Sequence, residues 1–146
     1  MKYYIADTHF GHENSIKFDN RPFADIEEMD EALITNWNAV VREEDEVYIL
    51  GDFCYRSSKK PSWYLKRLHG KKHLIIGNHD KELLRDEEAM QLFEWVDKMT
   101  YVKDGKYTIV LTEIRPFLNK VTSFVIPSII IIGLSLVTNC PLPFIL

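Results

Sequence analysis

Three short polar clusters in the first 80 residues carry side chains that could bind metal ions. They are Asp7-Thr8-His9, Gly51-Asp52 and Gly77-Asn78-His79-Asp80. Asp, His and Asn supply oxygen and nitrogen donors of the kind that suit Mn²⁺, Mg²⁺, Fe or Zn²⁺. Cations bound in this way activate water for attack on a substrate. The residue types therefore indicate a metal-dependent hydrolase.

Each cluster directly follows an apolar run of residues with high β-propensity. The runs cover residues 3–6, 47–50 and 74–76, and we expect each of them to form a strand. Side chains just past the carboxyl ends of neighbouring strands converge on one crevice in α/β sheets. Asp7 and His9 are two residues apart, so on an extended backbone both would point toward the same ion.

The spacing of apolar residues predicts helices between these strands. The stretch from Asp25 to Val41 keeps one face apolar, and Asp25 is a suitable N-cap. Shorter helices are expected over residues 61–68 and 81–93, and a type I′ hairpin at Asp104-Gly105. Alternating strands and helices are typical of an α/β layered sheet.

Composition narrows the possible partners and the cellular location. The chain has 146 residues and a formal net charge of −4, so we expect no stable complex with nucleic acid. Two cysteines, Cys54 and Cys140, do not make a disulfide framework. The first residues lack a basic segment followed by a long apolar stretch, so we expect no secretory signal and a cytoplasmic location. The composition does not indicate an oligomeric state.

The ordered set of clusters resembles the signature of the calcineurin-like metallophosphoesterases. That signature runs Asp-x-His, then Gly-Asp, then Gly-Asn-His-(Asp/Glu), and residues 1–111 match it in order. The resemblance is to small bacterial and phage-type phosphoesterases. It implies an α/β fold, a four-layer αββα sandwich that is incomplete after residue 111. It also implies hydrolysis of a phosphate monoester or diester of a small molecule or nucleotide.

The resemblance assigns metal-binding roles to four residues. Asp7 and His9 would bind a first cation, Asp52 would bridge two cations, and Asn78 would bind the second. Two divalent ions per chain are therefore expected. Mn²⁺ is the first choice, with Fe, Zn²⁺, Ni²⁺ or Mg²⁺ as alternatives.

The resemblance also assigns roles in handling the substrate. His79 would be the general acid for the leaving group, and Asp80 would hydrogen-bond to His79 and orient it. Arg56 matches an arginine that some family members direct at the phosphate. His12 and Asn14 would line the same crevice and contact the substrate.

The chain departs from the family pattern after Leu111. The family has a histidine soon after the strand expected at residues 107–111 and a later Gly-His-x-His motif, but no histidine follows His79 here. The second cation would then keep only Asp52 and Asn78 as ligands. An inactive, truncated remnant that binds at most one metal is therefore an alternative to an active enzyme.

We divide the chain into the N-terminal part of a metallophosphoesterase-type domain, residues 1–111, and an atypical apolar tail, residues 112–146. Residues 121–137 carry no charge, and three hypotheses remain open for them. They could anchor the protein in a membrane or form a buried pair of strands. The reading frame could also have shifted near Leu111, and the abrupt loss of charge and histidine favours this hypothesis.

Overall fold

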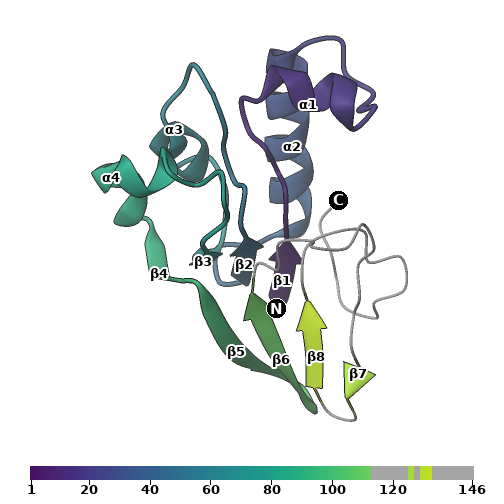
Figure 1. Cartoon of the computed structure of the whole chain (residues 1–146), viewed down its shortest axis with the longest axis vertical. Coiled ribbons are helices and arrows are strands. Elements are labelled where there is room, and N and C mark those ends of the chain that lie inside the picture. The colour runs from purple at the N-terminus through teal and green to yellow at the C-terminus, as the bar shows by residue number, and fades with distance from the viewer. Residues whose placement is uncertain (113–124, 127–128, 133–146) are drawn as a thin grey trace.

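A parallel sheet forms the half of the molecule that carries the three clusters. The computed structural model describes residues 1–112, 125–126 and 129–132. The parallel sheet has the strand order β1-β2-β3-β4 (Figure 1). Its strands are β1 (Lys2–Ile5), β2 (Glu46–Leu50), β3 (Lys71–Ile75) and β4 (Phe93–Asp97). All four strands therefore end at the same edge, as the predicted convergence of the clusters requires.

A second sheet packs against the first and has the order β5-β6-β8-β7. Its strands are β5 (Met99–Asp104), β6 (Tyr107–Thr112), β7 (Val125–Ile126) and β8 (Ile129–Ile132). Strands β5 and β6 form the predicted hairpin. Of the two loop residues, Gly105 has a positive φ of 57° and Lys106 does not, which fits a type II′ turn better than the type I′ turn predicted.

Helices lie over the other face of the parallel sheet, and all but the first supply residues to the apolar layer there (Figure 1). They are α1 (Glu13–Phe18), α2 (Ile26–Val40), α3 (Pro61–Leu65), the 3₁₀ helix η1 (Leu83–Arg85) and α4 (Glu87–Met90). Helix α2 matches its prediction, and the Asp25 side chain caps it by accepting a hydrogen bond from Glu28 N. Helix α1 was not predicted.

The single helix predicted over residues 81–93 is wrong. The chain leaves the helical conformation at Asp86, which has φ −85° and ψ 95°. The Asp86 carboxylate then caps a new helix by accepting a hydrogen bond from Ala89 N at 3.3 Å. This cap separates η1 from α4, and the segment after α4 enters the sheet as β4.

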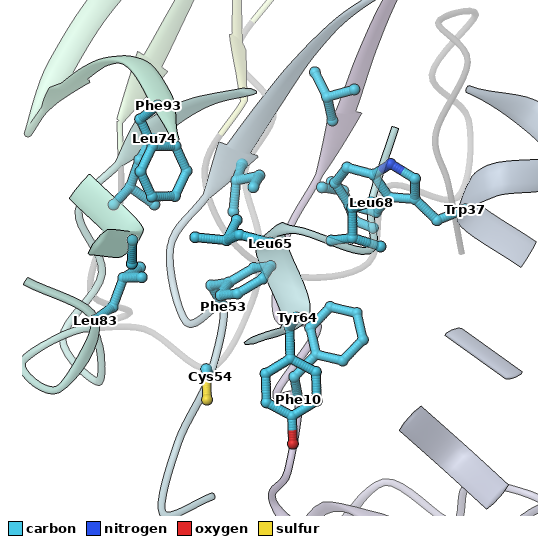
Figure 2. Close-up of a cluster of buried hydrophobic side chains, with 14 of the residues drawn as sticks. Phe10, Trp37, Phe53, Cys54, Tyr64, Leu65, Leu68, Leu74, Leu83 and Phe93 are labelled. Carbon is cyan, nitrogen blue, oxygen red and sulfur yellow. The ribbon is translucent and has the colours of Figure 1, made fainter. Parts of the chain in front are cut away.

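Two apolar layers hold the fold together. On one face of the parallel sheet, Tyr3, Ile5, Val47, Ile49 and Leu74 pack with residues of α2 and α3. Figure 2 shows part of this layer, including Trp37 of α2 and Tyr64, Leu65 and Leu68 from the segment of α3.

The opposite face of the parallel sheet meets the second sheet. Tyr4, Tyr48, Leu50 and Ile75 of the first sheet pack with apolar residues of the second, namely Val102, Ile109 and Leu111. The described residues thus form a helix layer, a parallel sheet and a mixed sheet. This arrangement confirms the predicted α/β sandwich and supplies three of its four expected layers.

Part of the apolar tail belongs to the second sheet. Strand β8 pairs with β6 in parallel, and β7 pairs with β8 in antiparallel orientation. Six residues of the segment 121–137 therefore form strands, as the strand hypothesis expects. No helix within the described ranges is long and apolar enough to span a membrane. Residues 113–124, 127–128 and 133–146 lie outside the described residues, so the frame shift near Leu111 stays a hypothesis.

Candidate functional site

Three side chains from the first two clusters meet at the carboxyl edge of the parallel sheet. The ligand atoms of Asp7, His9 and Asp52 all lie within 4.8 Å of one another. The distance between His9 Nε2 and Asp52 Oδ2 is 3.8 Å. Two carboxylates and one imidazole fit a divalent cation of the first transition row. The structure therefore brings together the predicted first-metal ligands and the predicted bridging residue.

The backbone at these residues is unusual. Asp7, His9 and Asp52 have positive φ values of 53°, 50° and 50°, a region that non-glycine residues seldom occupy and that is common at functional sites. Asp7 and His9 thus converge through left-handed turns, not along an extended strand end as predicted. The Asp7 and His9 N–H groups donate to the carbonyl groups of Gly51 and Asp52, at 3.4 and 3.1 Å. These bonds join the loop after β1 to the loop after β2.

Asp80 joins the loops after β2 and β3. Its side chain is fully buried, and its carboxylate accepts hydrogen bonds from the N–H groups of Asp52, Phe53 and Gly77 at 3.2, 3.0 and 2.6 Å. Burial raises the pKa of Asp80 to about 6. Three buried N–H groups thus have this carboxylate as their acceptor, and the hydrogen bond between His79 and Asp80 stays a prediction.

Gly77 allows the loops after β2 and β3 to lie in close contact. A Cβ atom at this position would lie 2.5 Å from Asp52 N and 2.6 Å from Asp52 Oδ1. Only glycine leaves room for the Asp52 carboxylate here. Gly77 is thus the residue of the third cluster whose backbone lies against Asp52, one of the candidate metal ligands.

His79 and Asn78 follow on this same loop. The His79 N–H donates to Asp52 Oδ1 at 2.9 Å, and the His79 ring centre lies 6.3 Å from that of His9. Asn78, which directly precedes His79 in the chain, is half-buried. The loop after β3 therefore carries both predicted residues to the edge of the Asp7, His9 and Asp52 group.

His12 also lies in this region. Its ring centre is 5.6 Å from that of His9, and its Nδ1 atom is buried without a hydrogen-bond partner among the residues described. Burial lowers the pKa of His12, and nearby His9, His79 and Arg56 lower it further. Burial likewise lowers the pKa of His9. Both rings therefore favour the neutral form, which is the form that binds metal ions.

The two remaining predicted residues, Arg56 and Asn14, lie in different surroundings. Arg56 has a positive φ of 50°, and its guanidinium carbon lies 5.2 Å from the ring centre of Tyr55. Asn14 is exposed on α1, and no contact between it and the cluster is found in the part of the chain that is described. His12 thus lies at the site, Arg56 is exposed beside Tyr55, and Asn14 is exposed on α1.

Sequence reasoning missed Tyr55. Its ring centre lies 4.2 Å from that of His79 and 5.0 Å from that of His12. Tyr55 comes three residues after Asp52, but tyrosine carries no metal-site signal there. Its partners come from other loops, so only the fold reveals the contact.

Sequence reasoning also missed two residues that support the first cluster. The Arg21 guanidinium donates to the carbonyl groups of Thr8 and Asp7, both at 3.0 Å. Asp30 of α2 accepts a hydrogen bond from Gly11 N at 2.9 Å. Asp30 shares the buried face of α2 with Ile34 and Trp37. An acidic residue on the apolar face of a predicted helix is the feature of the sequence that could have indicated its role.

Comparisons with known proteins show what this chain is similar to. A family model described as calcineurin-like phosphoesterase matches residues 3–129. An uncharacterized protein of Methanocaldococcus jannaschii is 52% identical over 81 residues, which cover 54% of this chain and 46% of that protein. The Gene 66 protein of Mycobacterium phage L5 is 35% identical over 94 residues, covering 62% of this chain and 44% of the phage protein.

A solved structure has a similar fold. It is the crystal structure of a protein of unknown function from Aquifex aeolicus, with 31% sequence identity and a TM-score of 0.64. The match covers 82% of this chain and 65% of the Aquifex chain. The chain spans about half the length of the curated relatives that it matches.

Proposed function

The chain belongs to the calcineurin-like phosphoesterase family, and from this premise we propose that it is a metal-dependent hydrolase of phosphate monoesters or diesters. One observation carries the proposal: the ligand atoms of Asp7, His9 and Asp52 converge within 4.8 Å at the carboxyl edge of the parallel sheet. The substrate is a phosphorylated small molecule or nucleotide, Mn²⁺ is the preferred cation, and the protein acts in the cytoplasm.

The residues divide the work of hydrolysis among them. Asp7 and His9 would hold a first cation, Asp52 would help to hold both cations, and Asn78 would offer an amide oxygen to the second. When bound, the cations supply Lewis-acid charge and an activated water nucleophile. His79 protonates the leaving oxygen as its bond to phosphorus breaks.

Arg56 supports this chemistry as an anion-binding group. Its guanidinium lies over Tyr55, whose ring contacts His79. A charge-assisted hydrogen bond from Arg56 to a phosphate oxygen would orient the ester toward the proton donor. His12, whose Nδ1 atom has no hydrogen-bond partner among the described residues, is suited to a polar contact with the same ester.

A one-metal remnant without turnover is the second candidate. The observation that favours it is the absence of histidine after His79, which leaves the second cation with two assigned ligands. Only one group of three candidate ligands is found among the described residues. An active enzyme would bind two cations per chain, whereas the remnant would bind one.

The experiment that tests the proposal is Mn²⁺-dependent hydrolysis of bis(4-nitrophenyl) phosphate by the 146-residue chain. Asp52→Asn is the control, because it keeps the shape of the side chain and removes its charge. We expect turnover that requires both Mn²⁺ and Asp52, with two Mn²⁺ per chain by calorimetry. A folded protein with one Mn²⁺ and no turnover would refute the enzyme and support the remnant.

A further inference from the structure

Tyr55 contacts three residues that the proposed function assigns to substrate handling. Its ring lies against the rings of His79 and His12, with centres 4.2 and 5.0 Å away. The guanidinium carbon of Arg56 lies 5.2 Å from the Tyr55 ring centre. These three partners come from the loops after β1, β2 and β3. Tyr55 is therefore the aromatic side chain at which the three site loops meet.

The position of Tyr55 separates it from the core. Phe53 and Cys54, just before it, are fully buried in the apolar layer under the helices. Tyr55 is half-exposed and is not a member of that layer. The next residue, Arg56, has a left-handed backbone with φ 50°. The segment thus leaves the core at Tyr55 and reverses direction at Arg56.

The contact geometry involves the ring of Tyr55 and not its hydroxyl group. The planes of Tyr55 and His79 are tilted by 52°, and those of Tyr55 and His12 by 84°. Tilted and edge-on arrangements are favourable for aromatic pairs. No hydrogen bond from the Tyr55 hydroxyl is found within the described part of the chain. Ring packing is therefore the interaction available to hold the two imidazoles.

We propose that Tyr55 is a positioning residue that holds the imidazole of His79 at the leaving-group side of the site. The proposal rests on the proposed function of His79 as a proton donor. Without the ring, the His79 side chain would regain rotational freedom, and misplacement by about 1 Å is enough to cost about 10²-fold in rate. Because the hydroxyl is not used, phenylalanine should replace Tyr55 without loss.

The test compares Tyr55→Phe and Tyr55→Leu on two phosphodiesters. Diphenyl phosphate has a poor leaving group that needs protonation, whereas bis(4-nitrophenyl) phosphate has a good one that needs it less. We expect Tyr55→Leu to lower kcat by about 10²-fold on diphenyl phosphate and by much less on the nitrophenyl ester, with Mn²⁺ affinity unchanged. Tyr55→Phe should match the parent protein on both esters.

Two controls separate positioning from general damage. Tyr101→Leu removes an equal ring from a site on β5 that is 77% exposed, and it should leave both rates unchanged. In a His79→Ala background, Tyr55→Leu should cause no further loss, because residues that act as one unit are not additive. Tyr55→Met replaces Tyr55→Leu if the leucine variant does not fold.

Three results would overturn the proposal. They are equal losses on the two esters, a loss in Tyr55→Phe as large as in Tyr55→Leu, and full additivity with His79→Ala. An NMR comparison decides the point without activity: Tyr55→Leu should move the ring-proton signals of His79 and His12, and unmoved signals would contradict the packing role. If the parent protein lacks Mn²⁺-dependent turnover, the proposed function fails. The NMR signals would still test whether Tyr55 packs against His79 and His12.

Discussion

The Asp30 carboxylate accepts a hydrogen bond from the Gly11 N–H at 2.9 Å and thereby joins α2 to the loop that carries His9 and His12. Its second oxygen accepts a hydrogen bond from the Tyr64 hydroxyl at 2.8 Å. Asp30 is only 2% exposed. This buried acid thus fixes the position of a site loop through a hydrogen bond to the loop backbone.

The first prediction concerns the loss of this acceptor. Asp30→Ala leaves the Gly11 N–H and the Tyr64 hydroxyl without their buried acceptor, so we expect the free energy of unfolding to fall by about 1–3 kcal/mol. Urea titration followed by circular dichroism measures the change. Glu27→Ala, at an exposed acid on the same helix, should change stability by less than about 0.5 kcal/mol. Equal losses in the two variants would contradict a special role for Asp30.

The second prediction concerns Gly11. Its φ is +72°, and an added Cβ atom would lie 2.1 Å from Ser57 Oγ and 2.8 Å from the Tyr64 hydroxyl. Gly11→Ala therefore combines a disfavoured backbone with a clash, and we expect it to weaken both stability and Mn²⁺ binding. Gly105→Ala is the matched control: its φ is +57° and nothing lies within 4 Å of the new atom.

The control isolates backbone strain from the clash. Gly105→Ala should cost about 1–2 kcal/mol, the price of a left-handed alanine, and leave Mn²⁺ binding unchanged. Calorimetric titration with Mn²⁺ and urea unfolding would measure both effects. The prediction would be contradicted if Gly11→Ala were as stable as Gly105→Ala and bound Mn²⁺ with the affinity of the parent protein. Ser57 and Tyr64 would then move away from the new Cβ atom at no cost in free energy.

The third prediction concerns pH. Burial raises the pKa of Asp30 above its ordinary value of 3.8, so the folded protein binds this proton more tightly than the unfolded chain does. The free energy of unfolding should therefore fall as the pH rises from about 4 through the folded-state pKa. In Asp30→Asn, which cannot ionise, this component of the pH dependence should vanish. Urea titrations from about pH 4 to about pH 7 compare the two proteins, and identical pH profiles would refute the assignment.

The fourth prediction concerns metal binding and stability. If Asp7, His9 and Asp52 hold Mn²⁺ only in the folded state, Mn²⁺ at about 100 times its Kd should stabilise the protein by about 2.7 kcal/mol. A chelator should remove this gain. Asp7→Asn should lose most of it, whereas Glu94→Gln, at an exposed acid on β4, should keep it. Thermal unfolding with and without Mn²⁺ would reveal the difference.

Much of the candidate site was predictable because each cluster follows a strand. The parallel order β1-β2-β3 brings the ends of these strands to one edge, so Asp7, His9 and Asp52 converge as expected. The left-handed turns at these residues were not predictable, because φ is set by the bonds between loops. Neither was the role of Asp80, whose three N–H donors come from two loops that are distant in sequence.

The errors in the fold have local causes. Strand β4 was not predicted, and only its first residue, Phe93, lies within the helix expected over residues 81–93. The Asp86 cap, which restarts the helix, depends on a hydrogen bond to Ala89 N that competes with helix continuation. Asp30 was not singled out from the sequence, and it is buried because it lies beside Ile34 and Trp37 on one helix face.

Strand β8 has a further consequence through its position between β6 and β7. Its parallel pairing with β6 from Thr108 to Leu111 occupies hydrogen-bonding groups that would otherwise form an open strand edge. An open edge recruits strands from other molecules and leads to aggregation. Residues 129–132 therefore cover the edge of β6, and we expect a shortened form that lacks them to be less soluble.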